Sequence, residues 1–351
     1  PGMAGQGIYL GSPLMHEDDE EKPIEVQYKG GCGWRHVAVG LVFSLSVVCY
    51  ADRTNIGIVL ARNGFQSIPR EDKGLILASF FVGYIFSQIP AGILARRWGV
   101  KPVLLLAALT WTACDVLSPW LAQIGLVPLL VGRIGMGLGE GLVLPTQQAF
   151  ANFWIPHSER AFLVCAMVGG QEFGSVLANI VSPQLLELGM VYVFLFWAAA
   201  AVLWLCVFTL LGSSAPELHA RCTQSGESAW IMQNREAPHI DEVRQTREQE
   251  STCPVRLLRE PCVWAIFVAH IGLNYSWYVV LSWMPTFYAD KYDLDLAAHT
   301  HILAIPYMGA FVGMLLISKV SDRLISRGMR TRHVRKLVQA IGACGFALFL
   351  Q

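Results

Sequence analysis

Long runs of apolar residues alternate with short polar connections along most of this 351-residue chain. Eight runs with few charges are long enough for a helix that crosses a bilayer, which takes about 20 residues. The predicted spans cover residues 36–60, 74–95, 102–122, 126–150, 161–185, 190–211, 262–288 and 299–319. Because the runs are continuous and do not alternate with a period of two, they favour helices over a membrane barrel. A ninth run begins near Leu337 and stops at Gln351, below spanning length.

One long polar segment divides these spans into two groups. The pattern predicts a polar N-terminal tail (1–35), a six-helix half (36–211), a central loop (212–260) and a partial second half (261–351). This layout is typical of transporters that are built from two repeats. We therefore expect an all-α polytopic membrane protein with two six-helix halves, the second of them incomplete, in a chain that is truncated at its C-terminus.

Two basic turns, six spans apart, resemble each other and support the repeat. One follows the second span and the other follows the eighth, and both close a helix whose last turn contains small residues. A simpler explanation is that any hairpin on the cytoplasmic side tends to be basic. The candidate cytoplasmic gate residues in these turns are Gly92, Arg96, Arg97, Gly99, Lys101, Asp322 and Arg323.

Lysine and arginine are distributed unequally between the two sides of the predicted membrane. With a cytoplasmic N-terminus, 20 of the 26 lie in inside segments and four in outside segments, while Arg53 and Arg133 lie within spans. This asymmetry agrees with the positive-inside rule. It predicts a cytoplasmic N-terminus.

The composition restricts the kinds of function that the chain can have. Only 15% of the residues are charged, against about a quarter in soluble domains, and the formal net charge is zero, so nothing indicates a nucleic-acid partner. The nine cysteines form no CxxC pair, and neither a metal site nor a disulfide framework is indicated. The chain also contains no HExxH or GxSxG motif, which argues against a membrane enzyme. We expect no cofactor besides a coupling ion, H⁺ or Na⁺.

Charged residues inside spans are the main candidates for function, because each costs roughly 2.5–3.5 kcal/mol on insertion scales unless it has a partner or a wet cavity. Arg53 in the first span and Arg133 in the fourth both lie ~10–12 Å from the outer surface, counted at about 1.5 Å per residue. Two guanidinium groups at one level need an anion or a carboxylate between them. Glu140 shares a helix face with Arg133 and is predicted to lie ~10 Å deeper.

These residues allow more than one interpretation. Arg53 favours substrate binding and Glu140 favours coupling or gating, since a buried carboxyl group is a candidate proton carrier. Arg133 is a candidate for substrate binding, although it could equally brace neighbouring backbone carbonyls. Asp52 points away from Arg53 along the helix, which indicates a structural or interface role, and Asp115 is left open.

Other polar residues in the spans add candidates. Glu172 and His270 are candidates for coupling or gating, and Asn274 is a candidate for substrate binding. His270 and Asn274 lie one turn apart on one face, where cavity lining and plain helix packing are equally good explanations. The glycines at positions 135, 137, 139 and 141 are expected to allow close contact between helices.

Several motifs resemble one transporter family. The stretch 132–145 (GRIGMGLGEGLVLP), followed by 154–160 (WIPHSER), is similar to the major facilitator superfamily, and more narrowly to its anion:cation symporter branch. The segments 50–55 (YADRTN) and 282–288 (SWMPTFY) fit the same branch. That branch holds vesicular glutamate and sialic-acid carriers, animal sodium/phosphate cotransporters and plant plastid phosphate and ascorbate transporters. The residues of the segment 282–288 look most like those of the plant and algal members.

The resemblance implies twelve helices, alternating access and cation-driven transport of a small anion, with no enzymatic activity. It places a substrate-anion contact on Arg53 and links Arg133 and Glu140 to binding and to proton or sodium coupling. Two departures matter. Leu273 stands where the glutamate carriers have an arginine, which argues against glutamate, and Arg96 replaces the usual aspartate of the first basic turn. Inorganic phosphate is the first candidate substrate, and an organic anion such as ascorbate or a carboxylate is the second.

The expected partners are a small anionic substrate and the lipid bilayer, with a monomer as the working unit of the complete protein. A transport-dead receptor on the same fold is a less favoured alternative, because charges retained inside the spans would then be costly relics. The membrane is left open between a plastid envelope or thylakoid, the endomembranes and the plasma membrane.

Overall fold

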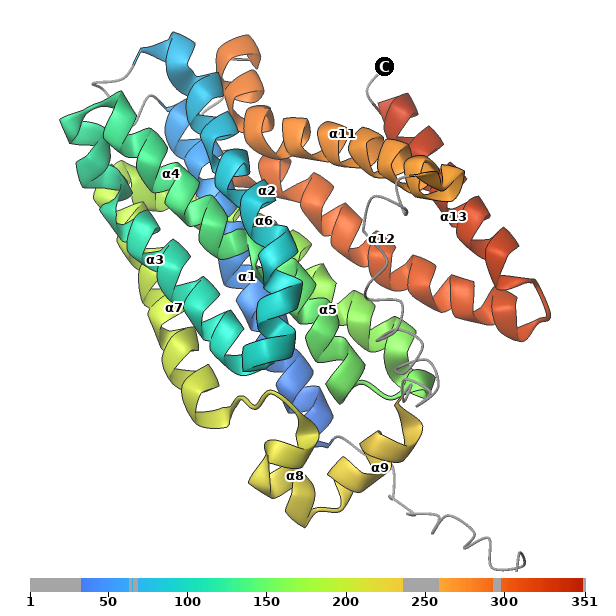
Figure 1. The fold of residues 1–351 in the computed structure, drawn as a ribbon. Helices are drawn as coiled ribbons and strands as arrows, with labels where there is room; N and C mark the ends of the chain where they lie inside the picture. Colours follow the sequence, from blue (N-terminus) through green and yellow to red (C-terminus); the bar gives the residue numbers. More distant parts are fainter. Residues whose placement is uncertain (1–32, 63–64, 66–68, 236–258, 293–297, 350–351) are drawn as a thin grey trace, which may run out of the picture.

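The described part of the chain is a set of long helices that run back and forth through one bundle, with α12 packed along α6 and with α11 and α13 extending away from the bundle (Figure 1). In the computed structural model, the described residues are 33–62, 65, 69–235, 259–292 and 298–349. The long helices are α1 (Trp34–Ala61), α2 (Lys73–Trp98), α3 (Val100–Ile124), α4 (Leu126–Gly141), α5 (Val143–Trp154), α6 (Arg160–Leu188), α7 (Met190–Leu211), α11 (Pro261–Tyr292), α12 (Thr300–Ser326) and α13 (Thr331–Phe349).

Eight spans in these ranges are long and apolar enough to cross a membrane, with α4 and α5 counted together as one. The described residues contain no strand. The predicted fold class, an all-α integral membrane protein of many spans, is therefore confirmed. We call the end of the bundle where α1 begins and α7 ends the base, which is the lower end in Figure 1.

The fourth predicted span is broken in its middle. α4 ends at Gly141 and α5 begins at Val143, whereas the sequence pattern predicted one helix over 126–150. Pro145 explains the break, because a proline has no amide hydrogen and its ring clashes with the carbonyl four residues earlier, that of Gly141. The amide of Leu142 instead donates to the carbonyl of Gly139 at 3.2 Å. Glu140 consequently lies in the last turn of α4, where the helix dipole disfavours an anion.

The ninth helix begins earlier than its apolar run. α13 starts at Thr331, six residues before Leu337. Its first turns contain the basic segment 331–336, which does not belong to the apolar run. α2 and α12 likewise continue through basic residues before they end. Helix formation needs no apolar side chains, so the helices extend past the apolar runs.

Close packing of α2, α3 and α4 depends on glycine. A Cβ atom at Gly83 would overlap the carbonyl of Ile134, and one at Gly137 would overlap the carbonyl of Phe80. A Cβ atom at Gly139 would lie 2.7 Å from the amide nitrogen of Trp111. Small residues thus let the backbones touch, as is common between membrane helices, and the predicted role of Gly137 and Gly139 in helix contact is confirmed.

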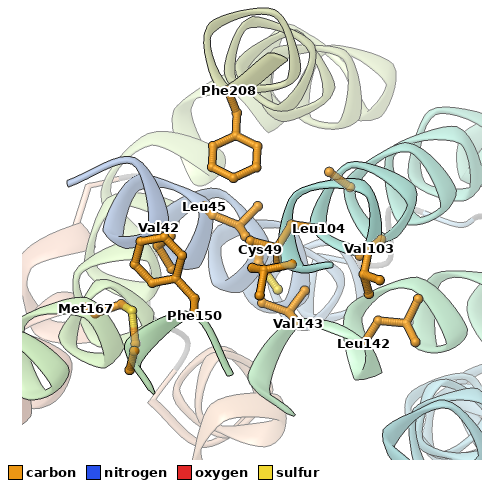
Figure 2. Packing of buried hydrophobic residues seen from close by; sticks show 14 of the residues in the cluster. Val42, Leu45, Cys49, Val103, Leu104, Leu142, Val143, Phe150, Met167 and Phe208 are labelled. Carbon is orange, nitrogen blue, oxygen red and sulfur yellow. The ribbon is translucent and has the colours of Figure 1, made fainter. Parts of the chain in front are cut away.

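The apolar core of the first six spans gathers around α1. Figure 2 shows Leu45 and Cys49 of α1 beside Leu104 of α3, Val143 of α5 and Phe208 of α7, all of them buried. Cys49 is 2% exposed in this cluster, and it also lines a small space beside Arg53 and Glu140.

Part of the predicted central loop folds against the base. After α7, the short helices α8 (Ala220–Gln224) and α9 (Glu227–Asn234) lie at the beginning of α1 (Figure 1). The buried carboxylate of Glu227 accepts hydrogen bonds from the amide of Trp34 at 2.6 Å and from Arg35 Nη1 at 2.8 Å. Arg35 Nε also donates to Glu159 at 2.7 Å. Glu227 thus caps α1, and Arg35 joins α9 to the beginning of α6. Residues 236–258 of the predicted loop lie outside the described residues.

The two basic turns both end a helix with a glycine in the left-handed region. Gly99 has φ 86° after α2, and Gly328 has φ 92° after α12. Lys101 Nζ donates to the carbonyl of Thr209 at the end of α7, at 2.7 Å. The arginine side chains at positions 96, 97 and 323 are exposed, and a Cβ atom at Gly92 would meet nothing within 4 Å. The side chain of Asp322 lies outside the described residues.

The glycine contacts predict a large difference between two similar substitutions. Gly137→Ala should lower the free energy of unfolding by about 1–3 kcal/mol, because the new methyl group overlaps the Phe80 carbonyl. Gly40→Ala is the matched control, since a Cβ atom there meets nothing within 4 Å. Thermal unfolding in detergent, followed by helical circular dichroism, should show a lower midpoint for Gly137→Ala only. Equal midpoints would contradict the packing role.

His219 connects the capping of α8 to pH. Its Nδ1 accepts a hydrogen bond from the amide of Cys222 at 3.2 Å, so protonation would remove this cap. Burial of the ring lowers the pKa of His219 below the ordinary 6.5, against a hydrogen bond to the Leu211 backbone that raises it. The cations Arg221 and Lys101 lower the pKa further, and Glu227 raises it. The folded state therefore favours the neutral ring.

We expect α8 to loosen in mild acid. A lowered pKa stabilises the fold above pH 6.5, the ordinary value, and this contribution is lost as the pH falls below it. Hydrogen–deuterium exchange of the amides in 220–224, corrected for intrinsic rates, should accelerate from about pH 7.5 to about pH 5.5. His219→Asn keeps a capping group that does not titrate and should lose the acceleration. An equal acceleration in this variant would contradict the assignment to His219.

Candidate functional site

A buried ion pair joins the first and fourth spans. Arg53 of α1 donates from Nε to Glu140 Oε2 at 2.8 Å and from Nη2 to the same oxygen at 2.6 Å. Arg53 is 6% exposed and Glu140 is 1% exposed. The pair resolves two local problems, because it neutralises an arginine inside the membrane and a carboxylate at the end of α4.

The geometry of this pair corrects the depth predicted from the sequence. Glu140 was expected ~10 Å deeper than either arginine, yet its carboxylate touches Arg53. Side chains lean toward the N-terminus of their own helix. α1 and α4 are antiparallel, so Arg53 leans toward the base while Glu140 leans toward the opposite end, and the two long side chains meet.

Aromatic rings enclose the guanidinium group of Arg53. Its Cζ lies 4.5 Å from the ring centre of Tyr50, 4.8 Å from that of Phe80 and 4.9 Å from that of Tyr84. Tyr278 of α11 adds a fourth ring, and its hydroxyl accepts a hydrogen bond from Arg53 Nη1 at 3.0 Å. Such rings attract a desolvated cation. Through Tyr278, the pair also contacts the helices that follow the central loop.

The guanidinium group of Arg133 packs against Met136 and Phe80. Arg133 is 2% exposed, its Nη1 lies 2.9 Å from Met136 Sδ, and its Nε has no hydrogen-bond partner among the described residues. Its Cζ lies 5.3 Å from the ring centre of Phe80, the ring that Arg53 also contacts. Phe80 therefore contacts both guanidinium groups, and the carboxylate of Glu140, which binds Arg53, also interacts electrostatically with Arg133. This agrees with the carboxylate that two arginines at one level were predicted to need.

Two aspartates lie buried beside these residues. Asp52 Oδ2 accepts a hydrogen bond from Trp111 Nε1 at 3.2 Å, which joins α1 to α3 and agrees with the interface role predicted for Asp52. Asp115 is fully buried, and neither of its carboxyl oxygens has a hydrogen-bond partner in the described part of the chain.

Glu172, His270 and Asn274 line a different space. They face a cavity of about 990 Å³ that is bounded by α1, α6, α11, α12 and α13. Glu172 is 9% exposed, and its Oε2 has no partner among the described residues. Asn274 Nδ2 donates to the carbonyl of His270 in its own helix at 2.8 Å. The structure thus brings these three predicted residues together, at a distance from the ion pair.

Tyr50 and Gln171 connect the two places. Both line the large cavity, and both also line a space of about 10 Å³ beside Arg53 and Glu140. The ion pair therefore lies behind Tyr50 and Gln171 as seen from the large cavity. Neither Gln171 nor Tyr278 is a charged residue that stands out in a span, although Tyr278 follows Asn274 by four residues and so shares its helix face.

The large cavity is closed toward the end opposite the base. There α11 packs on α1, and a Cβ atom at Gly57 would lie 3.0 Å from the carbonyl of Ser282. Ala61 and Leu281 belong to one buried cluster at this end. From this contact, α11 leaves the bundle in the direction of α13 (Figure 1). The described residues contain no group of three His, Cys, Asp or Glu side chains that could hold a metal ion.

The match to a known family rests on most of the chain. A profile described as the Major Facilitator Superfamily matches residues 42–351. The chain belongs to the major facilitator superfamily. Members of this superfamily that have been solved share its fold, including a bacterial homologue of the human lysosomal transporter Spinster, inward-facing and unoccupied (TM-score 0.62, 17% identity, 85% of this chain and 64% of that chain). A D-xylose–proton symporter matches with a TM-score of 0.54 at 18% identity, over 84% of this chain and 70% of that chain.

Relatives in this superfamily include plastid anion and phosphate transporters and sialin. The chain is 31% identical to the chloroplastic ascorbate transporter of Arabidopsis thaliana, over 90% of this chain and 57% of the relative. It is 32% identical to the chloroplastic sodium-dependent phosphate transport protein 1 of the same plant, over 90% and 60%. Human sialin is 30% identical, over 80% and 55%. This superfamily member thus spans somewhat more than half the length of these relatives, which are transporters and not enzymes.

Proposed function

We propose that this protein is a secondary active transporter in which H⁺ or Na⁺ drives the symport of a small anion by alternating access. The Arg53–Glu140 pair is the observation that carries the proposal. Arg53 is a cation that could bind an anion, and Glu140, which now occupies it, is a carboxylate that a proton can neutralise. Inorganic phosphate is the first candidate substrate, and an organic anion such as ascorbate or a carboxylate is the second. Relatives that are named as ascorbate and phosphate transporters support both candidates.

Competition for Arg53 would couple the cation to the anion. A buried arginine is costly without a negative partner, and so is a buried carboxylate without a positive one. When a proton or Na⁺ neutralises Glu140, Arg53 is released and can hold the oxygens of a substrate, for which its forked geometry is suited. Anion and cation would then enter together, since either one alone leaves a buried charge unpaired.

Tyr278 would transmit this exchange to the gate. Its hydroxyl binds Arg53 while its ring packs against Phe81 of α2, with ring centres 4.8 Å apart. Opening the end opposite the base must separate α11 from α1 and so break the Tyr278–Arg53 hydrogen bond. Whatever occupies Arg53 therefore biases the equilibrium between the closed and the open gate.

The base would face the cytoplasmic side, according to the distribution of lysine and arginine. Glu172, His270 and Asn274 would then line the path between the base and Arg53, through the cavity of about 990 Å³. A plastid membrane is one candidate location, because several relatives are named chloroplastic.

Two substitutions should separate binding from coupling. Arg53→Ala should lower anion uptake at least about thirtyfold, because it removes one partner of a buried charge pair. Glu140→Gln should retain anion binding while uptake no longer responds to a proton or sodium gradient, because the amide does not titrate. The measurement is uptake of radiolabelled phosphate, with ascorbate as competitor, into proteoliposomes that contain the protein expressed from its complete reading frame.

Arg62→Ala is the control for loss of a positive charge, because Arg62 is exposed at the end of α1. Unchanged uptake by Arg53→Ala would rule out the substrate contact. A gradient dependence that persists in Glu140→Gln would rule out the coupling role.

Gly57 offers a test of alternating access. Gly57→Leu should wedge α1 from α11, because a side chain there meets the Ser282 carbonyl, and should favour the state that is open at the end opposite the base. A cysteine placed at Leu281, which is 2% exposed, should then react faster with a membrane-impermeant maleimide. Gly40→Leu is the control, since its Cβ meets nothing within 4 Å. Equal labelling in both variants would mean that this contact is not a gate.

A further inference from the structure

A second cavity lies at the base, away from the ion pair. Its volume is about 510 Å³, and it is bounded by the beginning of α3, the end of α7 and the beginning of α8. The aromatic, polar and charged residues considered below in its lining are Trp34, Lys101, Ser214, His219 and Arg221. None of them lines either of the cavities that contain the proposed transport residues.

The cavity is positively charged. Lys101 and Arg221 both line it, and no carboxylate is among its lining residues in the described part of the chain. The nearby carboxylates already have cationic partners, since Glu227 binds Arg35 at 2.8 Å and Glu217 binds Arg235 at 2.8 Å. Two cations therefore face this space without a carboxylate in it.

Hydrogen-bond donors add to this charge. The amide of Lys101 in the first turn of α3 donates to Ser214 Oγ at 3.0 Å, so this bond does not use the hydroxyl hydrogen of Ser214. The Cζ atom of the Arg221 guanidinium lies 5.4 Å from the ring centre of Trp34, and this group carries five N–H donors. Such donors suit the oxygens of a phosphate group.

Exposed leucines lie beside these donors. Leu210 is 82% exposed and Leu218 is 74% exposed, and both line the cavity. Leu210 belongs to the last turn of α7, where this apolar span ends, so the cavity lies at the level of the membrane surface. A ligand with one anionic end and one apolar end matches this arrangement better than a free anion does.

We propose that this cavity binds an anionic phospholipid. Lys101 and Arg221 hold the phosphate oxygens, Ser214 donates its hydroxyl hydrogen to the head group, and the acyl chains lie along the exposed leucines of α7. Because the site joins α3, α7 and α8, a bound lipid would hold the α8–α9 segment against the base.

The test is lipid retention by the purified 351-residue chain in native mass spectrometry, with phosphatidylglycerol and phosphatidylcholine of identical acyl chains. We expect the chain to retain phosphatidylglycerol preferentially. Lys101→Gln combined with Arg221→Gln should weaken this retention ~25-fold, at about fivefold for each cation lost near an anionic lipid surface. Arg332→Gln combined with Lys336→Gln is the matched control, since it removes two exposed cations from α13 and should change retention less than about twofold.

Arg221→Gln alone guards against a folding defect, because it leaves the Lys101–Thr209 hydrogen bond in place and should still weaken retention about fivefold. Circular dichroism reports whether each variant is folded. Equal retention of the two lipids, or retention by folded Arg221→Gln equal to that of the unaltered chain, would overturn the proposal. Displacement of phosphatidylglycerol by inorganic phosphate alone would also overturn it, because the cavity would then be a site for free anions.

Discussion

A buried arginine inside a membrane is costly without a negative partner, and the arrangement of the first spans depends on how Arg53 obtains one. The carboxylate of Glu140 lies 2.6 Å from its guanidinium. Glu140 has the complementary requirement, since it lies at the end of α4 where the helix dipole repels an anion. Either charge would be costly there without the other, so this ion pair holds α1 and α4 together in addition to their apolar contacts.

This pair can form only because the surrounding helices approach closely. Gly83 and Gly137 let α2 and α4 touch through their backbones, and α2 then presents Phe80 and Tyr84 to the guanidinium of Arg53. Larger residues at the glycines would move these rings away. Packing and charge thus support each other: the glycines place the aromatic rings, and the rings contribute to stabilising the cation that they enclose.

The same arginine also connects two parts of the chain that lie far apart in sequence. Tyr278 reaches it from α11, near the place where Gly57 and Ser282 bring α1 and α11 together. Farther along α11 the two parts line a large cavity, while α12 stays packed on α6. At the base, α9 is tied to α1 through Glu227 and Arg35. The bundle of the first six spans is therefore held at both of its ends, whereas its contact with α11 is concentrated at one.

The sequence by itself determined the number and type of the spans, because a bilayer requires about 20 apolar residues in a row whatever their neighbours are. It also identified Arg53, Arg133 and Glu140, since charges in such runs are costly and conspicuous. Pro145 could have predicted the break after Gly141. Only the tertiary structure decided that Arg53 binds Glu140, that Phe80 contacts both arginines, and that Glu172 belongs to another cavity. These contacts depend on the directions of long side chains on antiparallel helices and on the distances between helices, which positions along one helix do not contain.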